Sequence, residues 1–363
     1  MPDPQHLLQF VQTRLDEFLS ARTSILARVA DETAEFSSFS REFLRGGKRF
    51  RAQFCHQGWH AVTGTSASNS TEAIVGAAAA LEIFHAAALI HDDIIDNSDT
   101  RRGRPSAHRR FERQHMHSRW AGDSAEYGRS AAILLGDLLL GWSDELLDDA
   151  LSALNDAAIA REARDEFRRM RTEVTAGQFL DILEEKSWAT HSNAEQVRRA
   201  ETVATFKSAK YSVEAPLSLG AIVGGGRADQ LAALRAYGLP LGIAYQLRDD
   251  LLGVFGDSAV TGKPSGDDLR EGKRTVLIGL TRMALSSAGR DEIDGLLGDP
   301  RLGDADVTRI QTLIRESGAD AQVETRIVDE VAKASEAIRR APLDGVAIDE
   351  LLELADAVTQ RDA

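Results

Sequence analysis

Two groups of acidic side chains in this sequence have the spacing of a metal-binding site. The first group is Asp92, Asp93 and Asp96, and the second is Gln246, Asp249 and Asp250. Asp92 and Asp96 share one face of a helix, where their like charges repel and the negative end of the helix dipole adds to the cost. Oxygen ligands without Cys or close His select a hard cation such as Mg²⁺, whose coordination phosphate oxygens often complete. The two groups together predict a diphosphate bridged by metal ions between two helices, although either group alone also fits a solvated acidic face.

Basic residues recur beside these acidic groups. They are Lys48 and Arg51 in the segment GGKRFR (46–51), Arg101 and Arg102 directly after the first group, and Lys207, Lys263 and Lys273 around the second. Glycines at 46 and 47 let the backbone approach a phosphate closely. The formal net charge of −14 argues against a nucleic acid or an anionic membrane as the partner, because both require a basic surface. Local clusters of cations in an acidic protein therefore indicate a phosphorylated substrate, or two such substrates.

The elements that must position these residues are helical. The 363-residue chain is 43% hydrophobic, which suits one large globular domain over 1–363. Apolar spacing predicts two helices within 5–45 and further ones over 54–62, 72–96, 131–150, 161–186, 193–223 with a possible kink at Pro216, 230–255, and from 275 to the end. Nothing resembles a run of strands, so the expected class is all-α. The apolar run Ala73–Ile90 contains Glu82 and His85, and we expect a core helix there, with no membrane span.

The N-terminus and the single cysteine indicate where the protein acts. No signal peptide is visible, and Cys55 fits a reduced, cytoplasmic protein in which this thiol fills the core.

Two further segments are expected to be loops. We expect the basic stretch 101–113 to be a loop and His108, His115 and His117 to be solvated, since no fourth zinc ligand accompanies them. The Gly-rich, charged segment 256–273 is a candidate lid.

Five segments of the sequence resemble the signature segments of the trans-type polyprenyl diphosphate synthases, the farnesyl and geranylgeranyl diphosphate synthase family. They are GGKRFR (46–51), EIFHAAALIHDDIIDNSDTRRGRPSAH (82–108), GQFLD (177–181), FKSAKY (206–211) and YQLRDDLLGVFGD (245–257). The resemblance implies a bundle of antiparallel helices around a deep cavity, present as a homodimer. It also implies head-to-tail condensation of isopentenyl diphosphate with an allylic diphosphate such as dimethylallyl, geranyl or farnesyl diphosphate.

The resemblance also implies a role for each site residue. Asp92, Asp96 and Asp249 would bind Mg²⁺, about three ions per site, with support from Asp93 and Asp250. The allylic diphosphate would be held by Arg101, Lys207 and Lys263, and isopentenyl diphosphate by Lys48, Arg51, His85 and Arg102. Gln178, Asp181, Ser208 and Gln246 would line the reacting region, with Asp267 and Lys273 nearby on the closing loop. Catalysis would rest on positioning and electrostatics, because no protein nucleophile is needed.

Two departures from the family pattern bear on activity and product. The second acidic motif usually has a third aspartate, and Gly253 stands in its place, so a supporting carboxylate is lost while Asp249 remains. Short-chain enzymes carry bulky aromatics where this chain has Ala87 and Ala88. Phe84, one turn deeper (about 5.4 Å), would then form the floor that limits growth of the product. This pattern predicts geranylgeranyl diphosphate, with ordinary core packing as the alternative role of Phe84.

Other functions fit the sequence less well. A farnesyl or a longer-chain synthase, of C25 and above, remains an alternative product assignment. Head-to-head synthases and terpene cyclases need no isopentenyl diphosphate site, so GGKRFR with His85 and Arg102 argues against them. An inactive partner subunit of a heteromeric prenyl synthase has Gly253 as its only support.

Overall fold

In the computed structural model, which describes residues 4–64, 71–256, 265–299 and 301–359, the chain is mostly helical and divides into two compact units. Unit 1 comprises residues 1–166 and 216–231, and unit 2 comprises residues 167–215 and 232–363. The all-α class is thereby confirmed. The expectation of a single domain over 1–363 stays a prediction.

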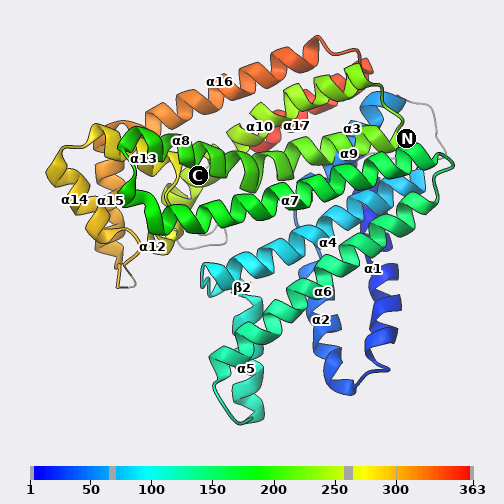
Figure 1. Cartoon of the computed structure of the whole chain (residues 1–363), viewed down its shortest axis with the longest axis horizontal. Helices are drawn as coiled ribbons and strands as arrows, with labels where there is room; N and C mark the ends of the chain where they lie inside the picture. Colours follow the sequence, from blue (N-terminus) through cyan, green and yellow to red (C-terminus); the bar gives the residue numbers. More distant parts are fainter. Residues whose placement is uncertain (1–3, 65–70, 257–264, 300, 360–363) are drawn as a thin grey trace. The chain divides into compact units, whose positions relative to one another are not determined.

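Unit 1 contains the N-terminal helices and the first acidic group (Figure 1). Its elements are α1 (Pro4–Leu26), the 3₁₀ turn η1 (Asp31–Thr33), α2 (Ala34–Phe43), α3 (Phe50–Thr63), α4 (Thr71–Ile95), β1 (Thr100–Arg101), β2 (Arg104–Pro105), α5 (Ala107–Ser118), α6 (Ser124–Ser152), the start of α7 (Ala157–Ser187), nearly all of α9 (Ala215–Val223) and the start of α10 (Ala228–Phe255).

Helix α4 is the core element of unit 1. Its alanines favour a helix and leave room for close neighbours, and it packs against α6, α3 and α1. A Cβ on Gly136 of α6 would lie 2.2 Å from the His91 ring, and one on Gly76 would lie 2.4 Å from Ala150. Among the described residues α4 alone is long and apolar enough to span a membrane, yet 78% of that window is buried. It is therefore the core helix that the sequence predicted.

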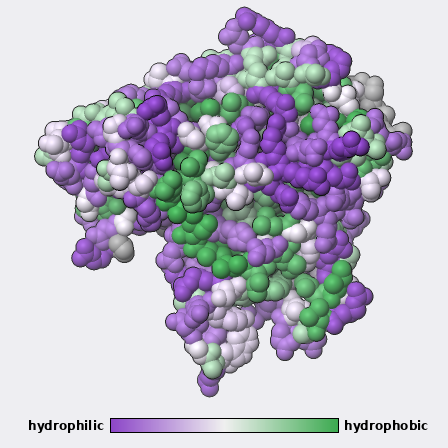
Figure 2. Space-filling view, in the orientation of Figure 1, coloured by the Kyte–Doolittle hydropathy of each residue, from purple (hydrophilic) through white to green (hydrophobic). Residues whose placement is uncertain are grey.

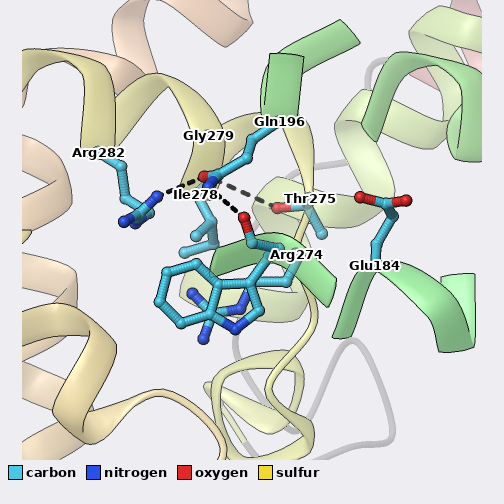
Figure 3. A pocket seen from close by; sticks show the side chains of 8 residues that line it. Glu184, Gln196, Arg274, Thr275, Ile278, Gly279 and Arg282 are labelled. Carbon is cyan, nitrogen blue, oxygen red and sulfur yellow. Dashed lines mark hydrogen bonds between the residues drawn. The ribbon is translucent and has the colours of Figure 1, made fainter. Parts of the chain in front are cut away.

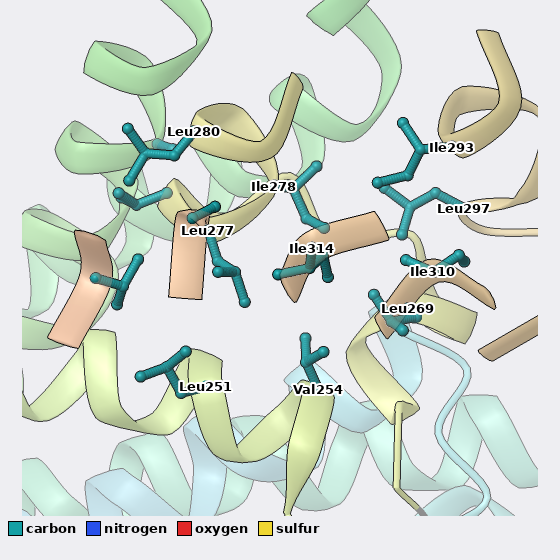
Figure 4. Close-up of a cluster of buried hydrophobic side chains, with 14 of the residues drawn as sticks. Leu251, Val254, Leu269, Leu277, Ile278, Leu280, Ile293, Leu297, Ile310 and Ile314 are labelled. Atoms are coloured by element: carbon teal, nitrogen blue, oxygen red, sulfur yellow. The ribbon is translucent and has the colours of Figure 1, made fainter. Parts of the chain in front are cut away.

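Unit 2 contains the second acidic group. Its elements are the rest of α7, the 3₁₀ turn η2 (Trp188–Thr190), α8 (Asn193–Val203), the π-helical segment η3 (Ala204–Glu214), the rest of α10, α12 (Asp267–Glu271), α13 (Val276–Ala284), α14 (Ser287–Leu296), α15 (Asp304–Ser317), α16 (Ala319–Arg339) and α17 (Gly345–Thr359). A cluster of buried aliphatic side chains forms its core (Figure 4), with contributions from α8, α10, α12, α13, α14, α15 and α16.

One sequence-based prediction of local structure was wrong. The basic stretch 101–113 is a loop only in part: β1 and β2, of two residues each, form an antiparallel ribbon, and α5 begins at Ala107. His108 and His115 are buried on α5, so the expectation of a solvated loop fails.

The predicted helix over 193–223 is present, because α8, η3 and α9 follow one another without a break. The sequence did not predict that its middle part, η3, is π-helical.

Candidate active site

The first acidic group lies where α4 ends. Asp92 and Asp93 belong to its last turn, and Asp96 follows directly, with its N–H donating to the Asp92 carbonyl (2.8 Å). Asn97 then takes a left-handed backbone (φ +54°), a conformation that asparagine tolerates and that stops a helix. The chain turns back through the β1–β2 ribbon, whose central residues Arg102 and Gly103 also have positive φ, as a tight type I′ turn requires.

This turn brings Arg101 back onto the acidic group. Its Nε and Nη2 donate to Asp93 Oδ1 at 2.9 and 2.5 Å, and its Nη2 lies 3.4 Å from Asp92 Oδ2. Asp93 is fully buried, so its charge must be paired in the fold. Arg101 is expected to bind the allylic diphosphate, and in this structure it is the cation that the carboxylates hold in place.

Two of the residues expected to bind isopentenyl diphosphate, Arg51 and Arg102, lie near a third, His85 on α4. Burial first, and then the charges of Arg51, Arg102 and Arg101, hold the pKa of His85 well below its usual range, so the ring is neutral near pH 7. Arg102 Nη1 also donates weakly to the Phe43 carbonyl (3.5 Å). Lys48, the fourth expected residue, is exposed with its Nζ 5.9 Å from the centre of the Phe50 ring.

Two glycines with left-handed backbone lie beside these cations. A Cβ on Gly47 (φ +83°) would lie 3.6 Å from the guanidinium of Arg102, and Gly46 also has positive φ. Arg49, buried at the start of α3, is engaged by the protein itself: Nη2 donates to the Leu44 carbonyl (2.8 Å) and to the Gln12 amide oxygen (2.5 Å). In the segment GGKRFR, Arg49 therefore stabilises the loop, and Arg51 lies near His85.

Glu82 is a charged residue of this region to which the sequence analysis gave no role. It is buried on α4, one turn from His85, and accepts the Ala52 N–H at 3.2 Å. Burial raises its pKa, while Arg51, Arg49 and Arg102 act in the opposite direction. Glu82 therefore places a carboxyl group among the guanidinium groups of Arg49, Arg51 and Arg102. The sequence offered a signal for this role, because Glu82 stands inside an apolar helix. A glutamate is rarely buried unless it is paired.

Further residues predicted for the site lie in unit 2, where α7 meets η3. A Cβ on Gly177 would lie 2.4 Å from the Lys207 backbone nitrogen, so only glycine allows this approach. Lys207 Nζ donates to Asp181 Oδ2 at 2.5 Å, which brings together two residues predicted for the site. Ser208 lies beside Lys207 on the π-helical segment and is half-buried. π-Helical segments are frequent at functional sites.

Gln178, one turn before Asp181 on α7, has a buried amide nitrogen that finds no hydrogen-bond partner among the described residues. Such a group costs free energy unless a water or ligand satisfies it. It therefore fits a residue that lines a polar site.

The second acidic group lies near the end of α10. Asp250 is 5% exposed and accepts a 2.7 Å bond from the Gln246 amide, whereas Asp249 is exposed. Burial first, and then the carboxylates of Asp268, Asp249 and Asp181, raise the pKa of Asp250 well above its usual range, against the lowering effect of the Gln246 bond. Carboxylates crowded in this way favour binding of a cation.

The donor chemistry of both acidic groups fits Mg²⁺. Within the described ranges no three His, Cys, Asp or Glu side chains form a ready-made ion site. Mg²⁺ is usually held by only one or two carboxylates, with water and substrate phosphates completing its shell. Asp92 with Asp96, and Asp249, are able to serve in that way.

Lys273 follows α12 and lies 3.5 Å from Glu271. The chain beyond it is anchored in a small pocket of unit 2 (Figure 3). There the guanidinium groups of Arg274 and Arg282 lie 3.8 and 4.5 Å from the centre of the Trp188 ring, and both donate to Asp294. About 10 Å³ of space remains, which is no more than one water needs. The pocket is therefore a structural clamp.

Lys263 lies outside the described residues, as do the other residues of 257–264 within the candidate lid 256–273. Of the residues predicted to limit the product, Phe84 and Ala87 are buried on α4 and Ala88 is half-buried.

Comparison with known proteins agrees with this geometry. The family model described as polyprenyl synthetase matches residues 33–314. A geranylfarnesyl diphosphate synthase from Aeropyrum pernix is 32% identical over 78% of this chain and 81% of its own length. A geranylgeranyl diphosphate synthase from Saccharolobus solfataricus is 32% identical over 78% of this chain and 77% of its own.

A crystal structure provides a further likeness. It is a geranylgeranyl pyrophosphate synthase from Corynebacterium glutamicum, complexed with isoprenyl diphosphate and magnesium. The match has a TM-score of 0.92 at 39% identity and covers 99% of this chain and 100% of that one.

Proposed function

Because the chain belongs to the polyprenyl synthetase family, we propose that this polyprenyl diphosphate synthase makes geranylgeranyl diphosphate by Mg²⁺-dependent head-to-tail condensation. The observation that carries the chain length is the sequence of side chains on α4 before Asp92. Ala87 and Ala88 leave room beside the helix, and the buried ring of Phe84 follows one turn deeper. The two alanines permit a product longer than farnesyl diphosphate, and the ring of Phe84 then prevents further elongation.

The reaction begins with departure of diphosphate from the allylic carbon. When bound, Mg²⁺ supplies positive charge that stabilises the departing group. Arg101 and Lys207 add fixed cations whose positions Asp93 and Asp181 determine through the bonds described above. Lys263 is proposed to act in the same way. Preorganised charge of this kind costs no rearrangement when the C–O bond breaks.

The second substrate then reacts with the allylic carbocation. Lys48, Arg51 and Arg102 are proposed to bind the diphosphate of isopentenyl diphosphate, and the neutral ring of His85 to donate one hydrogen bond to it. The buried carboxyl group of Glu82 lies among these guanidinium groups and is proposed to help position them. The isopentenyl double bond forms the new C–C bond, and a proton then leaves to the released diphosphate. The contribution of the protein is orientation and exclusion of water.

The proposed chain length is tested by two substitutions on α4. Phe84→Ala removes the floor, so its products should be longer than those of the parent enzyme. Ala87→Phe places a ring one turn closer to Asp92 and should shorten the product to farnesyl diphosphate. Chromatography of the dephosphorylated products measures both effects, with Ala153→Ser at the end of α6 as a control. If both variants keep the parental length, the floor lies elsewhere.

A longer product is the second candidate. The relative from Aeropyrum pernix is named for geranylfarnesyl diphosphate, which is one isoprene unit longer. The same chromatography separates the two products. A parent enzyme that stops at C25 would support this alternative and would remove Phe84 from its proposed role.

We also propose a cytoplasmic homodimer. Large apolar side chains reach the protein surface in patches (Figure 2). On α6 the neighbouring residues Ile133 and Leu134 are 44% and 60% exposed, and a second copy would bury them. Sedimentation of the purified protein as a monomer at micromolar concentration would contradict the dimer.

A further inference from the structure

The space beside Gly253 is filled by a carboxylate from another helix. A Cβ built on Gly253 of α10 would lie 2.0 Å from Oδ2 of Asp268 and 2.5 Å from its Cγ. Both distances are shorter than the contacts that a Cβ atom makes with non-bonded atoms. A side chain at position 253 and the present position of Asp268 therefore exclude each other.

Helix α12 is anchored so that Asp268 stays in this place. Gly266 and Gly272 flank it with positive φ (72° and 78°), which glycine adopts without strain. Leu269 is fully buried in the aliphatic core of unit 2, with Val254 and Ile310 in the same cluster (Figure 4). Its carbonyl accepts the Gly298 N–H at 2.9 Å. The burial and this hydrogen bond fix α12 at Leu269, the residue that follows Asp268.

Asp268 lies beside the helix that carries the second acidic group. Gly253 lies one turn after Asp249 and Asp250, which is the position at which the family motif has its third aspartate. A carboxylate is therefore present at that place, although α10 does not supply it.

Resting on the function proposed above, we propose that Asp268 of α12 provides the third carboxylate of the second acidic group and helps Asp249 to hold Mg²⁺ with the substrate diphosphate. Gly253 is then a requirement of this arrangement, because it leaves space for a carboxylate that comes from α12. A merely structural role for Asp268 is the alternative, since an aspartate in the first turn also suits the dipole of α12.

The two roles are separated by moving the carboxylate. In the full-length protein, Asp268→Asn removes the charge with little change of shape, and Gly253→Asp displaces Asp268 from its place. The double variant Gly253→Asp, Asp268→Gly returns the third carboxylate to α10 and frees the space. Asp304→Asn is the matched control, because Asp304 forms only an exposed 2.9 Å ion pair with Arg270 of α12.

The readout is Mg²⁺ binding in the presence of inorganic diphosphate, measured by calorimetry and by the rise in melting temperature. Each single variant should bind Mg²⁺ about 10- to 100-fold more weakly, as is typical when a supporting carboxylate of a metal site is lost. The double variant should recover most of this loss, and Asp304→Asn should bind as the parent does. Circular dichroism in the absence of metal checks that each variant is folded.

Two results would overturn the proposal: parental Mg²⁺ binding by Asp268→Asn, or a double variant that binds no better than Gly253→Asp alone. Either result would leave the proposed function intact if the parent protein elongates its allylic substrate. Conversely, a parent protein that binds Mg²⁺ and diphosphate as expected but forms no product would refute the proposed function and leave the role of Asp268 standing.

Discussion

Asp93 in unit 1 and Asp250 in unit 2 are both buried aspartates near the C-terminal end of a long helix, yet different groups surround them. Asp93 accepts two bonds from the guanidinium of Arg101. Asp250 accepts a bond from a neutral amide, and the carboxylates of Asp268, Asp249 and Asp181 raise its pKa. The first acidic group obtains positive charge from its own chain. The second concentrates negative charge and is therefore the stronger candidate for a group that a bound cation stabilises.

This difference indicates that the two groups depend differently on metal. A buried charge that is already paired contributes its stabilisation in the metal-free protein, and removing one partner leaves the other uncompensated. A carboxylate surrounded by other carboxylates destabilises the metal-free protein, and a bound cation removes this cost. Substitutions in the two groups should therefore have similar effects on activity and opposite effects on metal-free stability.

The largest effect is expected for the proposed metal ligands themselves. Asp92→Asn and Asp249→Asn should each lower kcat by about 10²- to 10³-fold, the loss typical for removal of one group that stabilises transition-state charge. Asp148→Asn on α6 is a control, since its carboxylate forms an ion pair with Arg164 (2.5 Å) on exposed surface. Elongation rates at saturating Mg²⁺ measure the effect. Retention of activity by Asp249→Asn would restrict metal binding to the first group.

The next effect separates the two groups by stability. Asp93→Asn should destabilise the metal-free protein by about 3 kcal/mol, because it leaves the largely buried guanidinium of Arg101 without its main partner. In Asp250→Asn the new amide oxygen can still accept the hydrogen bond from Gln246, and one of the crowded carboxylates is removed. The stability of the metal-free protein should therefore stay the same or rise. Urea unfolding in EDTA measures both. Equal losses in the two variants would show that the groups do not differ as described.

The smallest effect concerns pH and His85. Its pKa is lowered in the folded protein, so below about pH 6.5, its ordinary value, the unfolded chain binds a proton that the native state does not. The stability that this residue contributes is complete above that pH and is lost as the pH falls. Between pH 7.5 and 5.5 the parent protein should lose more stability than His85→Gln, measured by urea unfolding. Parallel pH profiles would mean that His85 is protonated in the fold.

Most of the helical architecture could be predicted, because long amphipathic or alanine-rich segments have a clear period. The expected helix over 72–96 and the observed α4, Thr71–Ile95, nearly coincide. Helix α5 was missed because its many arginines and histidines suggested a solvated loop. The signal was available in Ala107, Phe111 and His115, which recur every four residues and form its buried face.

Features that depend on tertiary contact could not be predicted in this way. The π-helical segment η3 lies against α7 through Gly177 and against α10 through Gly242, and neither contact has a local sequence signal. The absence of an aspartate at 253 was visible in the sequence, which therefore suggested a lost carboxylate. That Asp268 fills the space became apparent only once α12 was positioned by its buried Leu269.

The central claim is that this protein joins isopentenyl diphosphate to an allylic diphosphate in a reaction that needs Mg²⁺. The direct measurement incubates purified protein with dimethylallyl diphosphate and radiolabelled isopentenyl diphosphate, with Mg²⁺ or with EDTA, and separates the extracted products by chain length. We expect radiolabelled geranylgeranyl diphosphate in the presence of Mg²⁺ and none with EDTA. The absence of any elongated product with Mg²⁺ would contradict it.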